Sequence, residues 1–199
     1  YFMKFKVLYG LPRKVLFCKK TLMSNQRPVS VSEFLSKRDS KKKTIKFSKN
    51  GISDSYIYSK KKEKINYEDR EKKLLKLLNK HRGKYGKYDC IVPGSGGKDS
   101  GFATHILKYK YGMNPLTVTW PPILYTDYGY QNYLNWIKTC KVDNVTPNRN
   151  NKTMKLLTRL ALENLFHPFQ TFILGQKIFA TRIALKYKIP LVFFGENEA

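Results

Sequence analysis

The sequence predicts an α/β fold in which a parallel sheet is covered by helices on both faces. From about residue 66 onward, short apolar runs alternate with segments of helical periodicity. A glycine-rich stretch lies directly between one apolar run and the next helical segment, as is typical of a strand-to-helix turn. Because parallel strands need crossover connections, this alternation favours right-handed β–α–β units.

Residues 1–65 are predicted to form a small, irregular N-terminal appendage, and residues 66–199 the second domain. The appendage has few long periodic runs, and its residues 37–64 hold eleven Lys and Arg against three acids. We expect short strands around Thr44 to Phe47 and a turn at Asn50 and Gly51.

The first helix is predicted to begin at Tyr67, where apolar residues start to recur at spacings of three and four. Lys80 to Arg82 suit the negative end of its dipole, and Gly83 fits the residue just past its end. Strands and helices are then expected in this order: the strand YDCIVPG, a helix over 99–111, the strand PLTVTW, a helix over 129–139, a short strand over 144–146, helices over 151–165 and 175–187, and the strand IPLVFFG.

The composition is that of a folded protein, since 41% of the residues are hydrophobic and 14% aromatic. A net charge of +25 invites an anionic partner such as nucleic acid. The basic residues are spread along the chain, however, whereas a dedicated binding patch would concentrate them. Nucleic acid is therefore not a favoured partner, although the charge leaves it open.

The three cysteines are odd in number and far apart, so they predict no disulfide framework and favour a reducing compartment. No run approaches the ~20 apolar residues of a membrane span, and basic residues interrupt the first seventeen positions. We expect a cytoplasmic protein. The start at Tyr1 and the end at FFGENEA, just after a predicted strand, indicate a portion of a longer protein whose second domain is truncated at its C-terminus.

The glycine-rich stretch VPGSGGKDSGF, residues 92–102, is a candidate anion site, because backbone N–H groups at such a turn point toward a ligand. A Walker loop is excluded, since it needs glycine where Val92 stands and Ser or Thr where Asp99 stands. A dinucleotide fingerprint also needs glycine at Asp99. A tight turn that merely lets strand and helix pack is the simpler alternative.

The remaining match is SGGKDS, which resembles the PP-loop of the ATP pyrophosphatases. Together with FCKKTLMSNQRP, YDCIVPGSGGKDS, LKYKYGMNPLTVTW and IPLVFFGENEA, it makes the chain similar to the N-acetyl sugar amidotransferases of bacterial surface-polysaccharide and lipopolysaccharide synthesis. This resemblance implies a Rossmann-like PP-loop domain, of the adenine nucleotide alpha hydrolase-like type. It also implies adenylation of an acetamido group by ATP, followed by displacement of AMP by ammonia to give an acetamidino sugar.

The resemblance implies roles for nine residues. Lys98 would offset charge on the departing pyrophosphate, and Asp99, also a catalytic candidate, would need Mg²⁺ between itself and the phosphates. Trp120 is a candidate adenine contact, while Glu196 and Asn197 would contact substrate or Mg²⁺, or cap a following helix. The expected ATP-binding set is Ser95, Gly96, Gly97, Lys98, Asp99, Ser100, Trp120, Glu196 and Asn197.

The appendage departs from that family in its zinc-ribbon-like region. Members usually carry two CxxC pairs, but here the four positions read Cys18, Thr21, Ser53 and Tyr56. Neutral hydroxyls are poor zinc ligands, so no structural zinc is expected.

Partners implied by the resemblance are an N-acetyl sugar and a separate glutaminase with a cyclase-like subunit that supplies ammonia. Two other functions stay open: a PP-loop enzyme that modifies tRNA by thiolation or lysidine formation, and a degenerate ATP-binding protein without activity.

Overall fold

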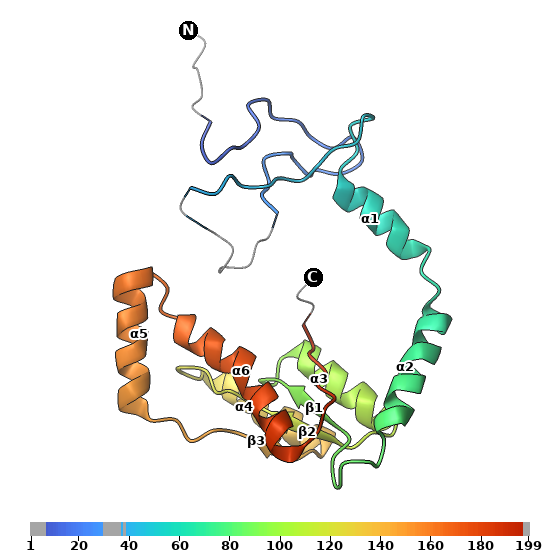
Figure 1. Ribbon diagram of the computed structural model, residues 1–199, viewed down its shortest axis with the longest axis vertical. Helices are drawn as coiled ribbons and strands as arrows, with labels where there is room; N and C mark the ends of the chain where they lie inside the picture. Colours follow the sequence, from blue (N-terminus) through green and yellow to red (C-terminus); the bar gives the residue numbers. More distant parts are fainter. Residues whose placement is uncertain (1–6, 30–36, 38, 197–199) are drawn as a thin grey trace. The chain divides into compact units, whose positions relative to one another are not determined.

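The computed structural model describes residues 7–29, 37 and 39–196 (Figure 1). The chain divides into two compact units, Tyr1–Glu68 and Asp69–Ala199. Helix α2, Tyr67–His81, contains the boundary between them. Among the helices so described, none is both long enough and apolar enough to cross a membrane.

The first unit is held by isolated antiparallel bridges and one helix. Phe17 pairs with Ser24, Pro28 with Thr44, and Phe47 with Ser53. Isolated bridges therefore stand where short strands were expected around Thr44 to Phe47, and Gly51 forms the expected turn with φ of 75°.

Helix α1, Asp54–Glu63, is an element that the sequence analysis missed. It buries none of its residues, so its sequence DSYIYSKKKE lacks the apolar periodicity that reveals a packed helix. Its signals lie at its ends instead. Ser53 is the N-cap and accepts a hydrogen bond from the Tyr56 N–H, and Lys60 to Lys62 occupy the last turn.

The second unit contains a parallel three-stranded sheet in the order β1-β2-β3, which confirms the α/β class and the parallel sheet. The strands are β1, Cys90–Pro93; β2, Pro115–Val118; and β3, Asn144–Val145. Cys90 aligns with Pro115, and Thr117 with Asn144. Buried Asp89 accepts hydrogen bonds from Gly83 N–H at 2.5 Å and Asn114 N–H at 2.8 Å, which ties the turn after α2 to the start of β2.

Helices cover both faces of this sheet, as the alternation of side chains along β1 requires. Ile91 packs with Ile183 and Ala184 of α6, Gln170–Tyr187. Cys90 and Val92 face the opposite way, into a cluster with residues of three other segments. That cluster comprises Leu78 of α2, Leu107, Met113, Cys90 and Val92.

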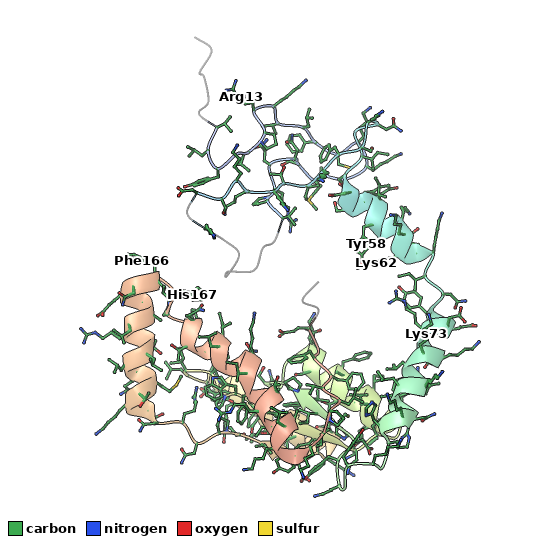
Figure 2. All side chains as sticks on the ribbon, viewed as in Figure 1. Arg13, Tyr58, Lys62, Lys73, Phe166 and His167 are labelled. Carbon is green, nitrogen blue, oxygen red and sulfur yellow. The ribbon has the colours of Figure 1, made fainter. Side chains whose placement is uncertain are left out.

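The remaining helices lie close to their predicted ranges. Helix α3, Lys98–His105, continues into the π-helix η2, Ile106–Lys110, and α4 spans Asp127–Cys140. Helix α5, Asn151–Leu165, is followed by the left-handed C-cap Phe166, with φ of 51°, and then by His167 (Figure 2). Helix α6 begins five residues before the predicted start, at Gln170, so Gly175 lies within it.

The predicted last strand, IPLVFFG, is wrong as a full strand. It pairs with β1 only around Val192, in parallel, through hydrogen bonds from Ile91 N–H to the Leu191 carbonyl and from Phe193 N–H to the Ile91 carbonyl. Beyond this point the segment leaves β1, because Gly195 passes over the first turn of α3. The order of paired segments is therefore Val192, β1, β2, β3.

We predict that Leu78→Ala destabilises the protein by about 2–5 kcal/mol, because it opens a cavity in a close-packed cluster. Leu78 is fully buried, whereas its neighbour Leu77 is 41% exposed. Leu77→Ala is therefore the matched control, with an expected loss of about 1 kcal/mol or less. Urea unfolding measures both, and equal losses would contradict the packing of α2 onto the sheet.

Candidate functional site

The candidate site lies at the carboxyl end of β1, where the chain connections diverge. From β1 the chain runs to β2 on one side, and it later returns to place Val192 on the other side. In open α/β sheets, ligands bind outside the carboxyl ends of the strands at such a switch point. A cavity of about 110 Å³ opens there.

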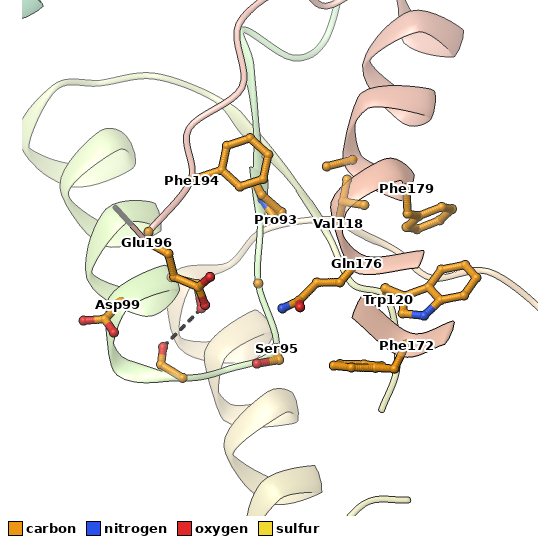
Figure 3. A pocket seen from close by; sticks show the side chains of 15 residues that line it. Pro93, Ser95, Asp99, Val118, Trp120, Phe172, Gln176, Phe179, Phe194 and Glu196 are labelled. Carbon is orange, nitrogen blue, oxygen red and sulfur yellow. Dashed lines mark hydrogen bonds between the residues drawn. The ribbon is translucent and has the colours of Figure 1, made fainter. Parts of the chain in front are cut away.

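Four segments line this cavity (Figure 3). They are the β1–α3 loop with the start of α3, the end of β2 with Trp120, α6 from Phe172 to Ala180, and the segment from Phe194 to Glu196. Residues far apart in the sequence thus meet at one sheet edge.

Two glycines of the loop are required by packing. A Cβ on Gly94 would lie 2.5 Å from the Ser100 Cβ and 2.7 Å from the Trp136 ring. Gly96 has φ of 87°, and a Cβ there would lie 2.6 Å from the Tyr133 backbone in α4. The loop therefore rests on α4 through its bare backbone.

Gly97 is different, because neither its backbone conformation nor its neighbours demand glycine. Its φ is −70°, and a Cβ would meet no atom within 4 Å. Gly97 nevertheless lines the cavity. The missing side chain therefore leaves open space at the cavity wall, where a ligand can approach the backbone.

Gly97 is also the N-cap of α3, and no side chain in the described ranges caps this helix. The first N–H groups of a helix have no acceptor within it, and they carry the positive end of the helix dipole. Asp99 and Ser100, in this first turn, both line the cavity. The arrangement is thus an uncapped helix start beside an open glycine, which suits an anionic ligand.

The start of α3 is held in place by a buried chain of hydrogen bonds. Trp136 Nε1 donates to Thr104 Oγ1 at 3.1 Å, and Thr104 Oγ1 donates to the Ser100 carbonyl at 2.7 Å. Thr104 is fully buried, so these bonds are shielded from competing water. They fix the angle at which α3 presents its first turn.

Trp120 forms the opposite wall. Its indole packs on Phe179 with ring centroids 5.6 Å apart, and the Arg149 guanidinium lies 5.6 Å from its ring centroid. A Cβ on Gly175 would lie 2.1 to 2.4 Å from the indole, so glycine in α6 makes room for Trp120. Trp120 Nε1 is buried and has no hydrogen-bond partner within the part of the chain that the structure describes.

Residues of α6 belong to the site although the sequence analysis did not name them. Figure 3 shows the Gln176 side chain extending from α6 toward the loop that carries Ser95. Phe172 and Phe179 line the same cavity. A polar Gln among apolar neighbours of a sheet-covering helix was the available signal, but nothing in the sequence indicated which loop α6 would face.

The predicted site residues separate into three groups. Six of them line the cavity: Ser95, Gly97, Asp99, Ser100, Trp120 and Glu196. Gly96 and Lys98 are not among the lining residues; Gly96 faces α4, and Lys98 is exposed at the start of α3. Asn197 lies outside the described residues.

Two acidic residues, Asp99 and Glu196, line the cavity. Mg²⁺ in proteins is commonly held by one or two carboxylates together with substrate phosphates, so the residues present fit a Mg²⁺–phosphate ligand. Within the described ranges, no three His, Cys, Asp or Glu side chains gather as a metal site made by protein alone.

The four positions of the predicted degenerate zinc site have other interactions in the first unit. Cys18 Sγ accepts hydrogen bonds from Ser53 N–H at 3.2 Å and Lys20 N–H at 3.5 Å. Burial would raise the pKa of the Cys18 thiol, but hydrogen bonds from Ser53 and Thr21 lower that pKa to about 6. Ser53 is fully buried and caps α1.

Comparisons with known proteins give limited matches. No protein-family model matches the chain. An uncharacterized protein of Methanocaldococcus jannaschii, MJ1599, is 37% identical over 84 residues, which are 42% of this chain and 30% of that protein. The chain thus matches less than a third of this relative's length.

Among solved structures, the NMN synthetase from Francisella tularensis is similar to the chain with a TM-score of 0.49 and 17% identity. The similarity covers 67% of this chain and 56% of that one. Similarity at this level carries no conclusion about fold or function.

We predict that serine destabilises the protein at Gly96 but not at the neighbouring position Gly97. Gly96→Ser should cost at least about 2 kcal/mol, from the left-handed backbone and the clash with α4. Gly97→Ser should leave stability unchanged or slightly higher, because Ser is a good N-cap. Thermal unfolding of both variants measures this, and a destabilised Gly97→Ser would show that the space at Gly97 is not open.

Proposed function

We propose that this chain binds ATP with Mg²⁺ at the β1–α3 loop, as a PP-loop ATP pyrophosphatase. The observation that carries the proposal is Gly97, which lines the cavity and has open space where a side chain would stand. The uncapped start of α3 and the position at the switch point support it.

The phosphates are the part of ATP that we assign to the cavity itself. A volume of about 110 Å³ is below the roughly 300 Å³ at which pockets for whole small molecules begin. Backbone N–H groups after Gly97 and the hydroxyls of Ser95 and Ser100 are the donors for phosphate oxygens. Asp99 and Glu196 would hold Mg²⁺, and Trp120 would contact the adenosine end.

The acceptor in this proposal is the acetamido group of an N-acetyl sugar, in line with the sequence resemblance. ATP supplies the adenylyl group: the acetamido oxygen attacks the α-phosphate and pyrophosphate leaves. Ammonia then displaces AMP, which carries the former acetamido oxygen, and an acetamidino group remains. Lys98 would stabilise the charge on the leaving pyrophosphate, and a separate glutaminase would supply the ammonia.

We predict that ATP with Mg²⁺ raises the thermal midpoint, since a ligand that binds only the folded state stabilises it. Gly97→Val should abolish this shift, because the branched side chain would fill the phosphate position. Phe102→Ala is the control, because Phe102 lies on α3 but is 69% exposed and does not line this cavity. Each midpoint is compared with the same variant free of nucleotide, and an equal shift in Gly97→Val would refute the site.

A second prediction concerns turnover. With ammonium as the nitrogen source, ATP should be split to AMP and pyrophosphate only when an N-acetyl sugar is also present. Lys98→Ala should slow this reaction by roughly 10²- to 10³-fold, the scale of one preorganised charge stabiliser. Chromatography of the nucleotide products measures both effects.

Other products would point elsewhere. ADP formation would contradict the proposed cleavage between the α- and β-phosphates. Turnover that requires tRNA and ignores the sugar would favour the tRNA-modifying function, and ATP binding without turnover would favour a degenerate ATP-binding protein.

A further inference from the structure

A second cleft lies beside the candidate nucleotide cavity, and the two share Trp120 and Phe179 as a common wall. Its volume is about 510 Å³, within the range of small-molecule pockets of roughly 300–1,000 Å³. Its other walls are the β3–α5 loop, the start of α5 and the face of α6 around Ile183.

The charge of this cleft is entirely positive. Arg149, Arg182 and Lys186 line it, and no Asp or Glu among the described residues does. Arg182 and Lys186 are four residues apart on α6, so they lie on one face of the helix. The first turn of α5, after the N-cap Asn150, adds the positive end of a helix dipole to the same wall.

Arg149 is held in a fixed orientation at this wall. Its guanidinium donates to the Pro121 carbonyl at 2.7 Å and to the Pro122 carbonyl at 2.9 Å, and it lies over the Trp120 ring. These contacts join the cleft directly to the segment that follows β2. The positive charge of Arg149 therefore stays near the Trp120–Phe179 wall. Arg182 and Lys186 are exposed and able to reach a ligand.

We propose that this cleft binds an anionic group, a phosphate or a carboxylate, on the acceptor molecule. The proposal rests on the proposed function, since the acceptor must reach the ATP site across the Trp120–Phe179 wall. Like charges gathered without acids repel one another, and an anion removes that cost. A concave cleft of this volume suits a small acceptor, whereas an RNA backbone is bound along an extended groove.

The test uses three probes that differ in charge: N-acetylglucosamine, N-acetylglucosamine 1-phosphate and N-acetylneuraminate. At least one anionic probe should bind the full chain about tenfold or more tightly than the neutral sugar, the scale of one charge-assisted hydrogen bond. Comparing the two anionic probes distinguishes phosphate from carboxylate. Titration calorimetry at low ionic strength measures the affinities.

The double variant Arg182→Gln/Lys186→Gln should lose this preference and keep its ATP-induced thermal shift. Lys152→Gln/Lys155→Gln is the matched control, since it removes two charges from the exposed side of α5 and leaves the cleft lining intact. The control should bind the anionic probe as the unchanged chain does.

The assignment would be overturned if the anionic probes bound no more tightly than the neutral sugar, or if the control variant bound the anionic probe as weakly as the Arg182→Gln/Lys186→Gln variant. It would also be overturned if the Arg182→Gln/Lys186→Gln variant lost the ATP-induced thermal shift. The fourth contrary result is binding of tRNA that needs Arg182 and Lys186 while neither anionic sugar binds. If the unchanged chain shows no ATP-induced thermal shift but binds an anionic probe through Arg182 and Lys186, the anion site is supported and the proposed function is contradicted. The two failures are therefore distinguishable.

Discussion

The site depends on one contact, the packing of the β1–α3 loop on α4 through backbone alone. Gly94 and Gly96 leave no room for a side chain against Trp136 and the Tyr133 backbone. With the loop this close, Trp136 reaches Thr104 and holds the first turn of α3 by hydrogen bonds. A loop lifted off α4 by a single methyl group would lose both the position of the helix start and its direction.

A second close approach completes the cavity from the far end of the sequence. A Cβ on Gly195 would lie 2.8 Å from Ser100 N, so this segment also touches α3 through bare backbone. That contact places Glu196 at the cavity, which Asp99 also lines. It also explains why the last segment pairs with β1 only around Val192, since the chain turns toward α3 immediately afterwards.

Charge is divided between the two cavities in a way that a net charge of +25 does not suggest. Asp99 and Glu196 line the first cavity, whereas the charged residues that line the second, among those that the structure describes, are Arg149, Arg182 and Lys186. The Trp120–Phe179 pair separates the two sets. A Mg²⁺–phosphate ligand in one cavity and an anionic acceptor in the other would each meet charges of the opposite sign.

The sequence by itself determined the α/β class, the parallel strands and most helix ranges, because periodicity and turn residues are local properties of the chain. Helix α1 was not predicted from the sequence because it packs no apolar face. The start of α6 was predicted too late, at Gly175, because glycine is an unfavourable residue within a helix. Only the tertiary structure decided that Gly175 makes room for Trp120, that Gly97 rather than Gly96 faces open space, and that Gln176 joins the site. The surroundings of these residues depend on which backbone segments approach within about 3 Å of each other. Contacts between distant segments leave no periodic signal in a single sequence.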